Sequence, residues 1–181
     1  AGGLQAAGVG QGDTVALMLP TSLAYFAAFF GTLLAGAICV PIYPPSRNVR
    51  IEEHVRRHLG ILANAGARAL IVPGEAVPLA RLLRTQSDTL RVVATVEELA
   101  GGGNPLRPVR VAAEDPALLQ YTSGSTGAPK GVILTHANLL ANIRAMSAAL
   151  AVGTGDVFVS WLPLYHDMGL IGAWLGTLHQ G

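Results

Sequence analysis

The sequence predicts an α/β fold in which a mostly parallel sheet is covered by helices on both faces. Short apolar runs, which are typical of buried strands, alternate with longer segments whose apolar residues recur every three or four positions, as they do on a helix. This alternation is the pattern of parallel strands joined by crossover helices, which cover the sheet on both faces. The predicted strands are Val15–Leu19, Ile38–Ile42, Leu70–Val72, Arg91–Ala94, Ala117–Leu119, Val132–Leu134 and Val157–Ser160.

The composition agrees with one folded core. The chain has 181 residues, of which 51% are hydrophobic and 13% are charged, and its net charge is +1. A basic stripe is missing, so the sequence does not indicate a nucleic-acid partner. The single cysteine, Cys39, lies in an apolar run. This position favours an inert core thiol in a reducing compartment, and we expect a cytoplasmic protein.

The first long predicted helix is apolar on both of its faces. Thr21 or Ser22 can cap its start, and the uncharged stretch Leu23–Val40 is long enough to span a bilayer. However, Pro20 and Pro41 bracket this stretch, as they would bracket a shorter strand–helix–strand unit. We therefore predict a buried helix and no membrane span, with a membrane-associated protein as the alternative.

The next predicted helix combines an apolar face with a charged one. The apolar face carries Ile51, Val55, Leu59 and Leu62, and the opposite face carries the ion pairs expected between Glu52 and Arg56 and between Glu53 and Arg57. His54 and His58 are four residues apart, a spacing that can bind a metal, but a third ligand is missing. We therefore expect a solvated histidine face, with the helix ending at Gly66. Further helices are predicted at Val77–Leu83, after an N-cap at Thr135, and at Met168–Leu178.

A polar loop between two predicted strands carries the strongest functional signal. The stretch Tyr121–Gly131 reads YTSGSTGAPKG and combines four hydroxyl side chains, three glycines and one lysine, Lys130. Glycines let successive N–H groups converge on an anion, while hydroxyls and the lysine add donors and charge. An ordinary hairpin turn is the simpler interpretation, but a tight hairpin needs far fewer special residues. The pattern is not a Walker loop, because a β-rich run follows Lys130 where that loop opens a helix. The loop therefore predicts a polyphosphate site.

The same stretch, followed by THANLLAN, resembles the phosphate-loop signature of the adenylate-forming enzymes. These include acyl-CoA synthetases, luciferases and peptide-synthetase adenylation domains. Two further stretches look most like the fatty-acyl-AMP ligase branch: AGAICVPIYPPSR at Ala35–Arg47 and WLPLYHDMGLIG at Trp161–Gly172. The resemblance implies that residues 1–181 are part of the large N-terminal AMP-binding domain, truncated at both ends and without the C-terminal domain. The family's later motifs carry the catalytic residues, which therefore stay unidentified, and we expect the isolated chain to be inactive.

By this resemblance the protein is a ligase that joins a fatty acid to ATP, releasing pyrophosphate and forming an acyl-adenylate, with Mg²⁺ as the implied metal. The implied phosphate-binding residues are Thr122, Ser123, Gly124, Ser125, Thr126, Gly127 and Lys130. The implied substrate-pocket residues are His166, Asp167 and Gly169. On the residues alone, a turn histidine hydrogen-bonded to Asp167 is the better interpretation of His166, and only the resemblance favours a substrate contact. We expect the phosphate loop and the segment Tyr165–Gly169 to follow two strands and to face one crevice.

The likeness to the fatty-acyl-AMP ligase branch also implies an acceptor for the activated acyl group. That acceptor is an acyl carrier protein, with coenzyme A expected to be a poor substitute. Two alternatives stay open, namely a long-chain acyl-CoA synthetase and a nucleotide-binding module without turnover.

Overall fold

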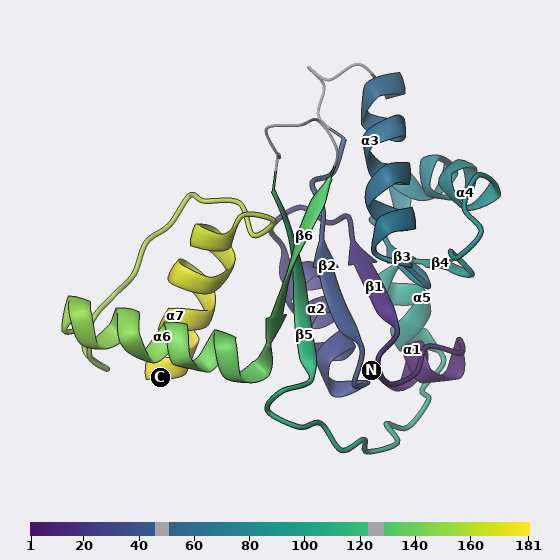
Figure 1. Ribbon diagram of the computed structural model, residues 1–181. Helices are drawn as coiled ribbons and strands as arrows, with labels where there is room; N and C mark the ends of the chain where they lie inside the picture. Colours follow the sequence, from purple (N-terminus) through teal and green to yellow (C-terminus); the bar gives the residue numbers. More distant parts are fainter. Residues whose placement is uncertain (46–50, 123–128) are drawn as a thin grey trace.

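A six-stranded sheet runs through the chain in a computed structural model that describes residues 1–45, 51–122 and 129–181 (Figure 1). Across the sheet the strands are β4 (Val92–Ala94), β3 (Ala69–Ile71), β1 (Thr14–Leu17), β2 (Ile38–Pro41), β5 (Pro116–Thr122) and β6 (Lys130–Thr135). Neighbouring strands from β4 to β5 are parallel, and β6 is antiparallel to β5. The prediction of a mostly parallel sheet is therefore confirmed.

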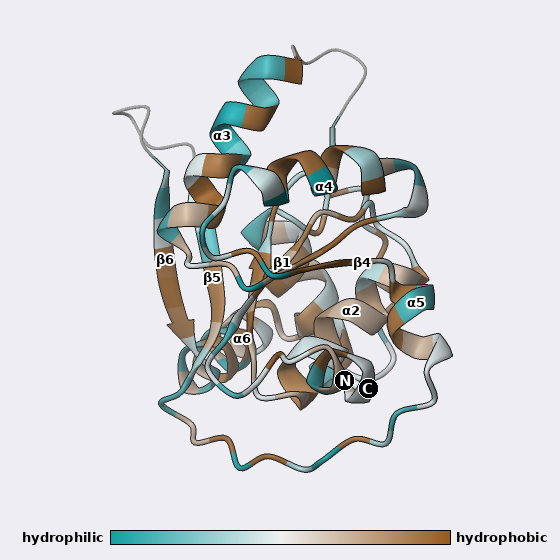
Figure 2. Cartoon of the chain, turned by 90° about the vertical axis from the view of Figure 1, so that its right-hand side faces the viewer, coloured by the Kyte–Doolittle hydropathy of each residue, from teal (hydrophilic) through white to brown (hydrophobic). Residues whose placement is uncertain are grey.

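Helices cover both faces of this sheet, as predicted. Side chains alternate along β1, so that Val15 and Leu17 join one buried apolar cluster while Ala16 joins another. Figure 2 shows β1 and β4 between α4 on one side and α2 and α5 on the other. The first cluster is covered by α1 (Gly2–Ala6), α2 (Leu23–Leu34), α5 (Val96–Gly101), α6 (His136–Leu150) and the π-helix η2 (Met168–Leu175). The second is covered by α3 (Ile51–Asn64), the short helix η1 (Gly74–Ala76) and α4 (Val77–Thr85), and the last helix is α7 (Gly176–Gln180).

The apolar stretch after Pro20 forms helix α2 followed by strand β2. Ser22 is the N-cap, and its hydroxyl accepts a hydrogen bond from the Tyr25 N–H at 3.2 Å. The helix has 12 residues, about 18 Å of length, and the chain turns at Gly36, whose φ is +73°. Within the described ranges, no helix combines the length and the apolar character that a membrane crossing needs. The Cys39 thiol is fully buried and burial raises its pKa, which agrees with an inert core thiol.

One predicted strand is wrong. Residues 157–160 form no strand, and Val157 is 89% exposed. A run of β-branched and aromatic residues becomes a strand only where a neighbouring backbone can pair with it and other side chains can cover it. In the described part of the chain β6 forms the sheet edge, and this run does not pair with it.

Helix α3 faces the sheet with a different stripe from the predicted one. His54 and His58 are only 1% and 0% exposed, so the expected solvated histidine face is wrong. They share the buried side with Ile61 and Leu62, and the Tyr43 ring packs against both imidazoles at centroid distances of 5.4 and 4.6 Å. Apolar periodicity could not reveal this, because imidazole side chains count as polar in the pattern although they pack well against an aromatic ring.

The expected ion pairs of α3 are also absent. Among the described residues the structure contains one ion pair, between Arg68 and Asp13 at 3.3 Å. Exposed pairs of this kind stabilise a helix by only a few tenths of a kcal/mol, so a better contact elsewhere easily displaces them. Arg57 has such a contact, because its guanidinium carbon lies 5.6 Å from the centre of the Tyr43 ring.

The polar loop joins the antiparallel strands β5 and β6. Thr122 pairs with Lys130, so seven residues, 123–129, separate the two paired positions. The loop thus belongs to a hairpin, but to one far longer than a two-residue turn. Strand β6 leads directly into α6 through the predicted N-cap Thr135, which forms a capping box with Asn138.

Candidate functional site

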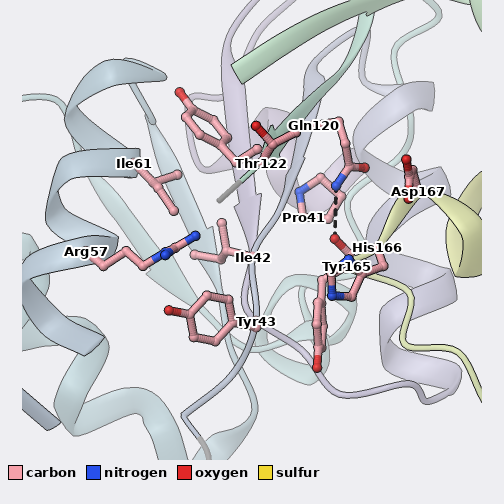
Figure 3. Close-up of a pocket in the computed structure, with 11 residues that line it drawn as sticks. Pro41, Ile42, Tyr43, Arg57, Ile61, Gln120, Thr122, Tyr165, His166 and Asp167 are labelled. Atoms are coloured by element: carbon pink, nitrogen blue, oxygen red, sulfur yellow. Dashed lines mark hydrogen bonds between the residues drawn. The ribbon is translucent and has the colours of Figure 1, made fainter. Parts of the chain in front are cut away.

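Two adjoining cavities open near the carboxyl ends of strands β2 and β5, where α/β sheets usually bind their ligands. The first has a volume of about 440 Å³ and is bordered by the end of β2, helix α3, the end of β5 and the segment 165–167 (Figure 3). The second has a volume of about 500 Å³ and is bordered by β6, α6 and η2. Gln120, Thr122 and Asp167 line both cavities and therefore stand at their junction.

Hydrogen bonds from β5 and from α2 hold the segment 163–167 in place, although no strand precedes it. The amide Nε2 of Gln120 donates to the carbonyl oxygen of Tyr165 at 3.0 Å (Figure 3). The hydroxyl of Tyr25 donates to the carbonyl oxygen of Leu164 at 2.8 Å, in a buried position. These contacts bring His166 and Asp167 into the cavity that Thr122 lines. Because residues 123–128 of the predicted phosphate loop lie outside the described ranges, the crevice shared by the whole loop and this segment stays a prediction. The predicted strand before the segment is wrong.

The Asp167 carboxylate has a local structural contact. Its Oδ1 accepts a hydrogen bond from the Met168 N–H at 2.8 Å, at the start of η2. Among the described hydrogen bonds none joins Asp167 to His166, whose ring lies 5.3 Å from that of Tyr165. Both side chains are exposed to the cavity and could meet a ligand.

Gly169 lies behind this segment. It is buried and lines neither cavity, and a Cβ at this position would collide with the carbonyl oxygen of Pro163. Its close packing against Pro163 explains why a glycine stands here. A contact between Gly169 and substrate stays a prediction.

The predicted phosphate-binding residues are only partly described. Thr122 ends β5 as an exposed residue at the junction of the cavities, and Lys130 opens β6 directly opposite it. Lys130 lines neither cavity. The predicted residues Ser123, Gly124, Ser125, Thr126 and Gly127 lie outside the described part of the chain.

The sequence analysis missed the junction residue Gln120, and it also missed Tyr43 and Arg57 of the first cavity. Arg57 reaches from α3 into the cavity toward Ile42 and Tyr43 (Figure 3). Its Nε atom is buried and has no hydrogen-bond partner. The only signal in the sequence was the Tyr-Pro-Pro turn after β2, because strand ends in this fold class border ligand sites.

The two buried histidines beside Tyr43 are neutral. Burial lowers the pKa of His58 to about 4, and it also lowers the pKa of His54. The Nδ1 of His58 donates to the carbonyl oxygen of His54 at 2.7 Å, since a carbonyl oxygen can only accept. The Nε2 of His58 and both ring nitrogens of His54 are buried without partners.

Beyond the junction, the second cavity is lined mainly by apolar side chains. These are Val132 and Leu134 of β6, Leu139 and Met146 of α6, and Met168 and Ile171 of η2, beside the amides of Asn138 and Asn142. Polar groups therefore concentrate in the first cavity and at the junction. Such a pair of cavities suits a ligand with a charged head and an apolar tail.

The donors around the first cavity fit a polyphosphate better than they fit a metal ion. The Thr122 hydroxyl, the Arg57 guanidinium and the nearby Lys130 ammonium are all donors to phosphate oxygens. Asp167 is the one carboxylate lining this cavity, and the described residues contain no cluster of three or more potential metal ligands. The described residues thus do not form a protein site for Mg²⁺, which often binds mainly through substrate phosphates.

Comparisons with known proteins agree with this geometry. The family model described as "AMP-binding enzyme" matches residues 1–181. Long-chain-fatty-acid--AMP ligase FadD32 of Mycolicibacterium smegmatis is 40% identical over 174 residues, which cover 92% of this chain and 26% of the relative. Medium-chain-fatty-acid--[acyl-carrier-protein] ligase TtuA of Teredinibacter turnerae is 31% identical, covering 93% of this chain and 32% of the relative.

A solved structure has the same fold. The fatty acyl-adenylate ligase from L. pneumophila, in complex with acyl adenylate and pyrophosphate, superposes with a TM-score of 0.80 at 32% identity, covering 99% of this chain and 31% of that chain. The chain thus spans about a third or less of the length of these relatives. The family match over all 181 residues and the shared fold establish that the chain belongs to the AMP-binding enzymes and is similar to fatty-acyl-AMP ligases among them.

Proposed function

We propose that the protein activates a fatty acid with ATP to form an acyl-adenylate and pyrophosphate. The observation that carries this proposal is the junction of a polar cavity with an apolar one at Gln120, Thr122 and Asp167. A fatty acid placed across this junction has its alkyl chain in the second cavity and its carboxylate beside the donors of the first. An amino acid's ammonium group would find Asp167 here but would leave the apolar cavity unfilled.

In the proposed reaction a carboxylate oxygen of the fatty acid attacks the α-phosphorus of ATP, and the bond to the β-phosphate oxygen breaks. Most of the catalysis in such a phosphoryl-group displacement is positioning and charge stabilisation. We assign the positioning of the carboxylate to His166 and to the junction residues. We assign stabilisation of the departing pyrophosphate to Thr122, Lys130 and the loop residues 123–127. Mg²⁺, which accompanies ATP in this chemistry, would enter with the phosphates and further offset their charge.

Transfer of the acyl group to the phosphopantetheine arm of an acyl carrier protein is the second part of the proposal. It is supported by the similarity to TtuA, whose name gives an acyl carrier protein as the acceptor. Free coenzyme A is then a poor acceptor, and we place the reaction in the cytoplasm, where ATP is available. A long-chain acyl-CoA synthetase is the alternative, because both enzymes make the same adenylate.

The test measures pyrophosphate exchange into ATP by the intact protein with a panel of medium-chain and long-chain fatty acids and amino acids. We expect exchange with fatty acids alone. The variant Lys130→Ala should lower the exchange rate about ten- to a hundredfold with little loss of stability, because an exposed donor to the leaving group is removed. The matched control Arg144→Ala removes an exposed charge from α6, away from both cavities, and should leave the rate unchanged.

Two results would contradict the proposal. Exchange with amino acids only would overturn the fatty-acid assignment and would make Asp167 the partner of an ammonium group. Equal rates for Lys130→Ala and Arg144→Ala would remove Lys130 from the phosphate site. Carrier protein and coenzyme A are then offered separately, and rapid formation of acyl-CoA would assign the protein to the synthetases.

A further inference from the structure

Arg57 places a positive charge in the first cavity without a neutralising partner. The predicted partner Glu53 does not pair with it, and the one ion pair in the described ranges joins Arg68 to Asp13. The stretches outside the description, 46–50 and 123–128, contain no Asp or Glu, so they cannot supply a carboxylate. The Arg57 Nε is buried and makes no hydrogen bond.

The neighbours of Arg57 fix its position without neutralising its charge. The guanidinium carbon lies 5.6 Å from the centre of the Tyr43 ring, a distance typical of a cation–π contact. Behind Tyr43 lie His54 and His58, both neutral because burial lowers their pKa. Asp167 lines the same cavity but lies beyond ion-pair distance from Arg57, and its carboxylate accepts a hydrogen bond from Met168.

A half-buried guanidinium with an unused donor is unfavourable in the ligand-free protein, because desolvation is not repaid by a hydrogen bond. An anion in the cavity would relieve this penalty. The planar fork of the guanidinium matches the oxygens of a phosphate group, and Thr122, with which the predicted phosphate loop begins, lines the same cavity. Arg57 and Thr122 thus line the same cavity, from α3 and from the end of β5.

We infer that Arg57 binds a phosphate group of a substrate or of the acceptor in the first cavity. Which molecule carries this phosphate group rests on the proposed function, which offers two candidates. One is the polyphosphate of ATP, released as pyrophosphate, and the other is the phosphate of a phosphopantetheine arm. In both cases Arg57 is a binding residue supplied by α3, outside the phosphate loop.

The test uses the intact protein and the variants Arg57→Gln and Arg56→Gln. Arg56 is the matched control, because it is the neighbouring arginine on α3 but is exposed and lines neither cavity. Binding is measured by calorimetry with three probes: inorganic pyrophosphate, 4′-phosphopantetheine, and pantetheine, which lacks the phosphate. We expect wild-type protein and Arg56→Gln to bind at least one phosphate-bearing probe. Arg57→Gln should bind that probe about ten- to a hundredfold more weakly, as the loss of a charge-assisted contact predicts.

The probes also identify the source of the phosphate. If Arg57→Gln loses affinity for pyrophosphate only, Arg57 binds the polyphosphate of ATP. If it loses affinity for phosphopantetheine only, while pantetheine binds as before, Arg57 binds the phosphate of the acceptor. Both outcomes support the inference. Equal binding of both phosphate probes by the Arg57→Gln and Arg56→Gln proteins would overturn it.

Thermal unfolding separates binding from a purely structural role. Without ligand, Arg57→Gln should have an unchanged or higher Tm than Arg56→Gln, because it removes an unsatisfied charge. A lower Tm with unchanged phosphate affinity would mean that Arg57 only holds Tyr43, and this would also overturn the inference. If Arg57→Gln does not fold, Arg57→Lys replaces it in the calorimetry, since lysine keeps the charge but loses the fork and should bind with intermediate affinity. If the wild-type protein binds phosphate through Arg57 but activates no fatty acid, the proposed function fails while the inference stands.

Discussion

At the scale of single residues, the histidine pair of α3 differs most from its predicted surroundings. His54 and His58 were expected in solvent, but they pack beneath Tyr43 beside the candidate site. A charge on the His58 ring would be placed close to Arg57, which already lacks a counter-charge. The pair therefore makes the stability of this region sensitive to acid.

The expected pH dependence follows from the lowered pKa of His58. The unfolded chain has the ordinary pKa of 6.5 and the folded protein a pKa of about 4, so below pH 6.5 the unfolded state binds the proton first. Above pH 6.5, neutral His58 therefore contributes about 3 kcal/mol to the free energy of unfolding. This contribution is lost as the pH falls from 6.5 toward 4. The check is the free energy of unfolding by urea at several pH values. His58→Asn, which keeps a donor toward the His54 carbonyl but cannot titrate, should show a smaller loss in this range.

The control for this measurement is His179→Asn, because His179 is exposed on the last helix. This variant should keep the pH dependence of the wild-type protein. If His58→Asn and His179→Asn lose stability equally between pH 6.5 and 4, acid sensitivity does not come from His58.

At the scale of elements, four of them meet around the second cavity: β5, β6, α6 and η2. The capping box at Thr135 starts α6 directly at the end of β6, and Asp167 caps η2 at the junction of the cavities. The depth available to an alkyl chain is therefore set by side chains on the inner faces of α6 and η2. Met146, which is half-buried, is one of them.

Met146→Trp should shift the preferred fatty acid toward shorter chains, because the indole ring fills part of the apolar cavity. Activation of long-chain acids should fall at least about tenfold relative to medium-chain acids, since a single methylene in an apolar pocket already has an effect of this size. The measurement is kcat/KM for each acid in the pyrophosphate exchange assay. Ala145→Trp places the same ring on the exposed side of α6 and should keep the chain-length profile. Identical profiles for the two variants would show that the alkyl chain lies elsewhere.

At the scale of the whole molecule, large apolar side chains are exposed on β6, which forms one edge of the sheet in the described structure, and in the segment between α6 and η2. Ile133 on β6 is 63% exposed, and Trp161, in the segment between α6 and η2, is 90% exposed. An open strand edge with apolar side chains is a surface on which other chains can associate.

Residues 1–181 produced alone should therefore self-associate as their concentration rises. Sedimentation velocity should detect this association, and the double variant Ile133→Ser, Trp161→Ser should reduce it. Leu23→Ser is the control, because Leu23 is an exposed leucine at the start of α2, away from β6. The prediction would be contradicted if the protein stayed monomeric at all concentrations. It would also be contradicted if Leu23→Ser reduced self-association as much as the double variant does.

Much of the fold and one part of the site were predictable from the sequence. The predicted strands between Val15 and Leu134 are confirmed, because buried parallel strands are continuous apolar runs between turn residues. The caps at Ser22 and Thr135 were found, because a hydroxyl before a helix has a local partner in the first turn. The phosphate loop and its family were recognisable because their residues are contiguous in the chain.

The tertiary structure decided what depends on contacts between distant segments. Which stripe of α3 is buried depended on Tyr43, and whether residues 157–160 form a strand depended on a pairing partner that β6 does not provide. The direction of Arg57 was decided in the same way, since a nearby aromatic ring displaced a weak ion pair along the helix. Local patterns encode interactions between residues a few positions apart. The junction of the two cavities joins β5, η2 and the segment before it, and only the folded sheet brings these together.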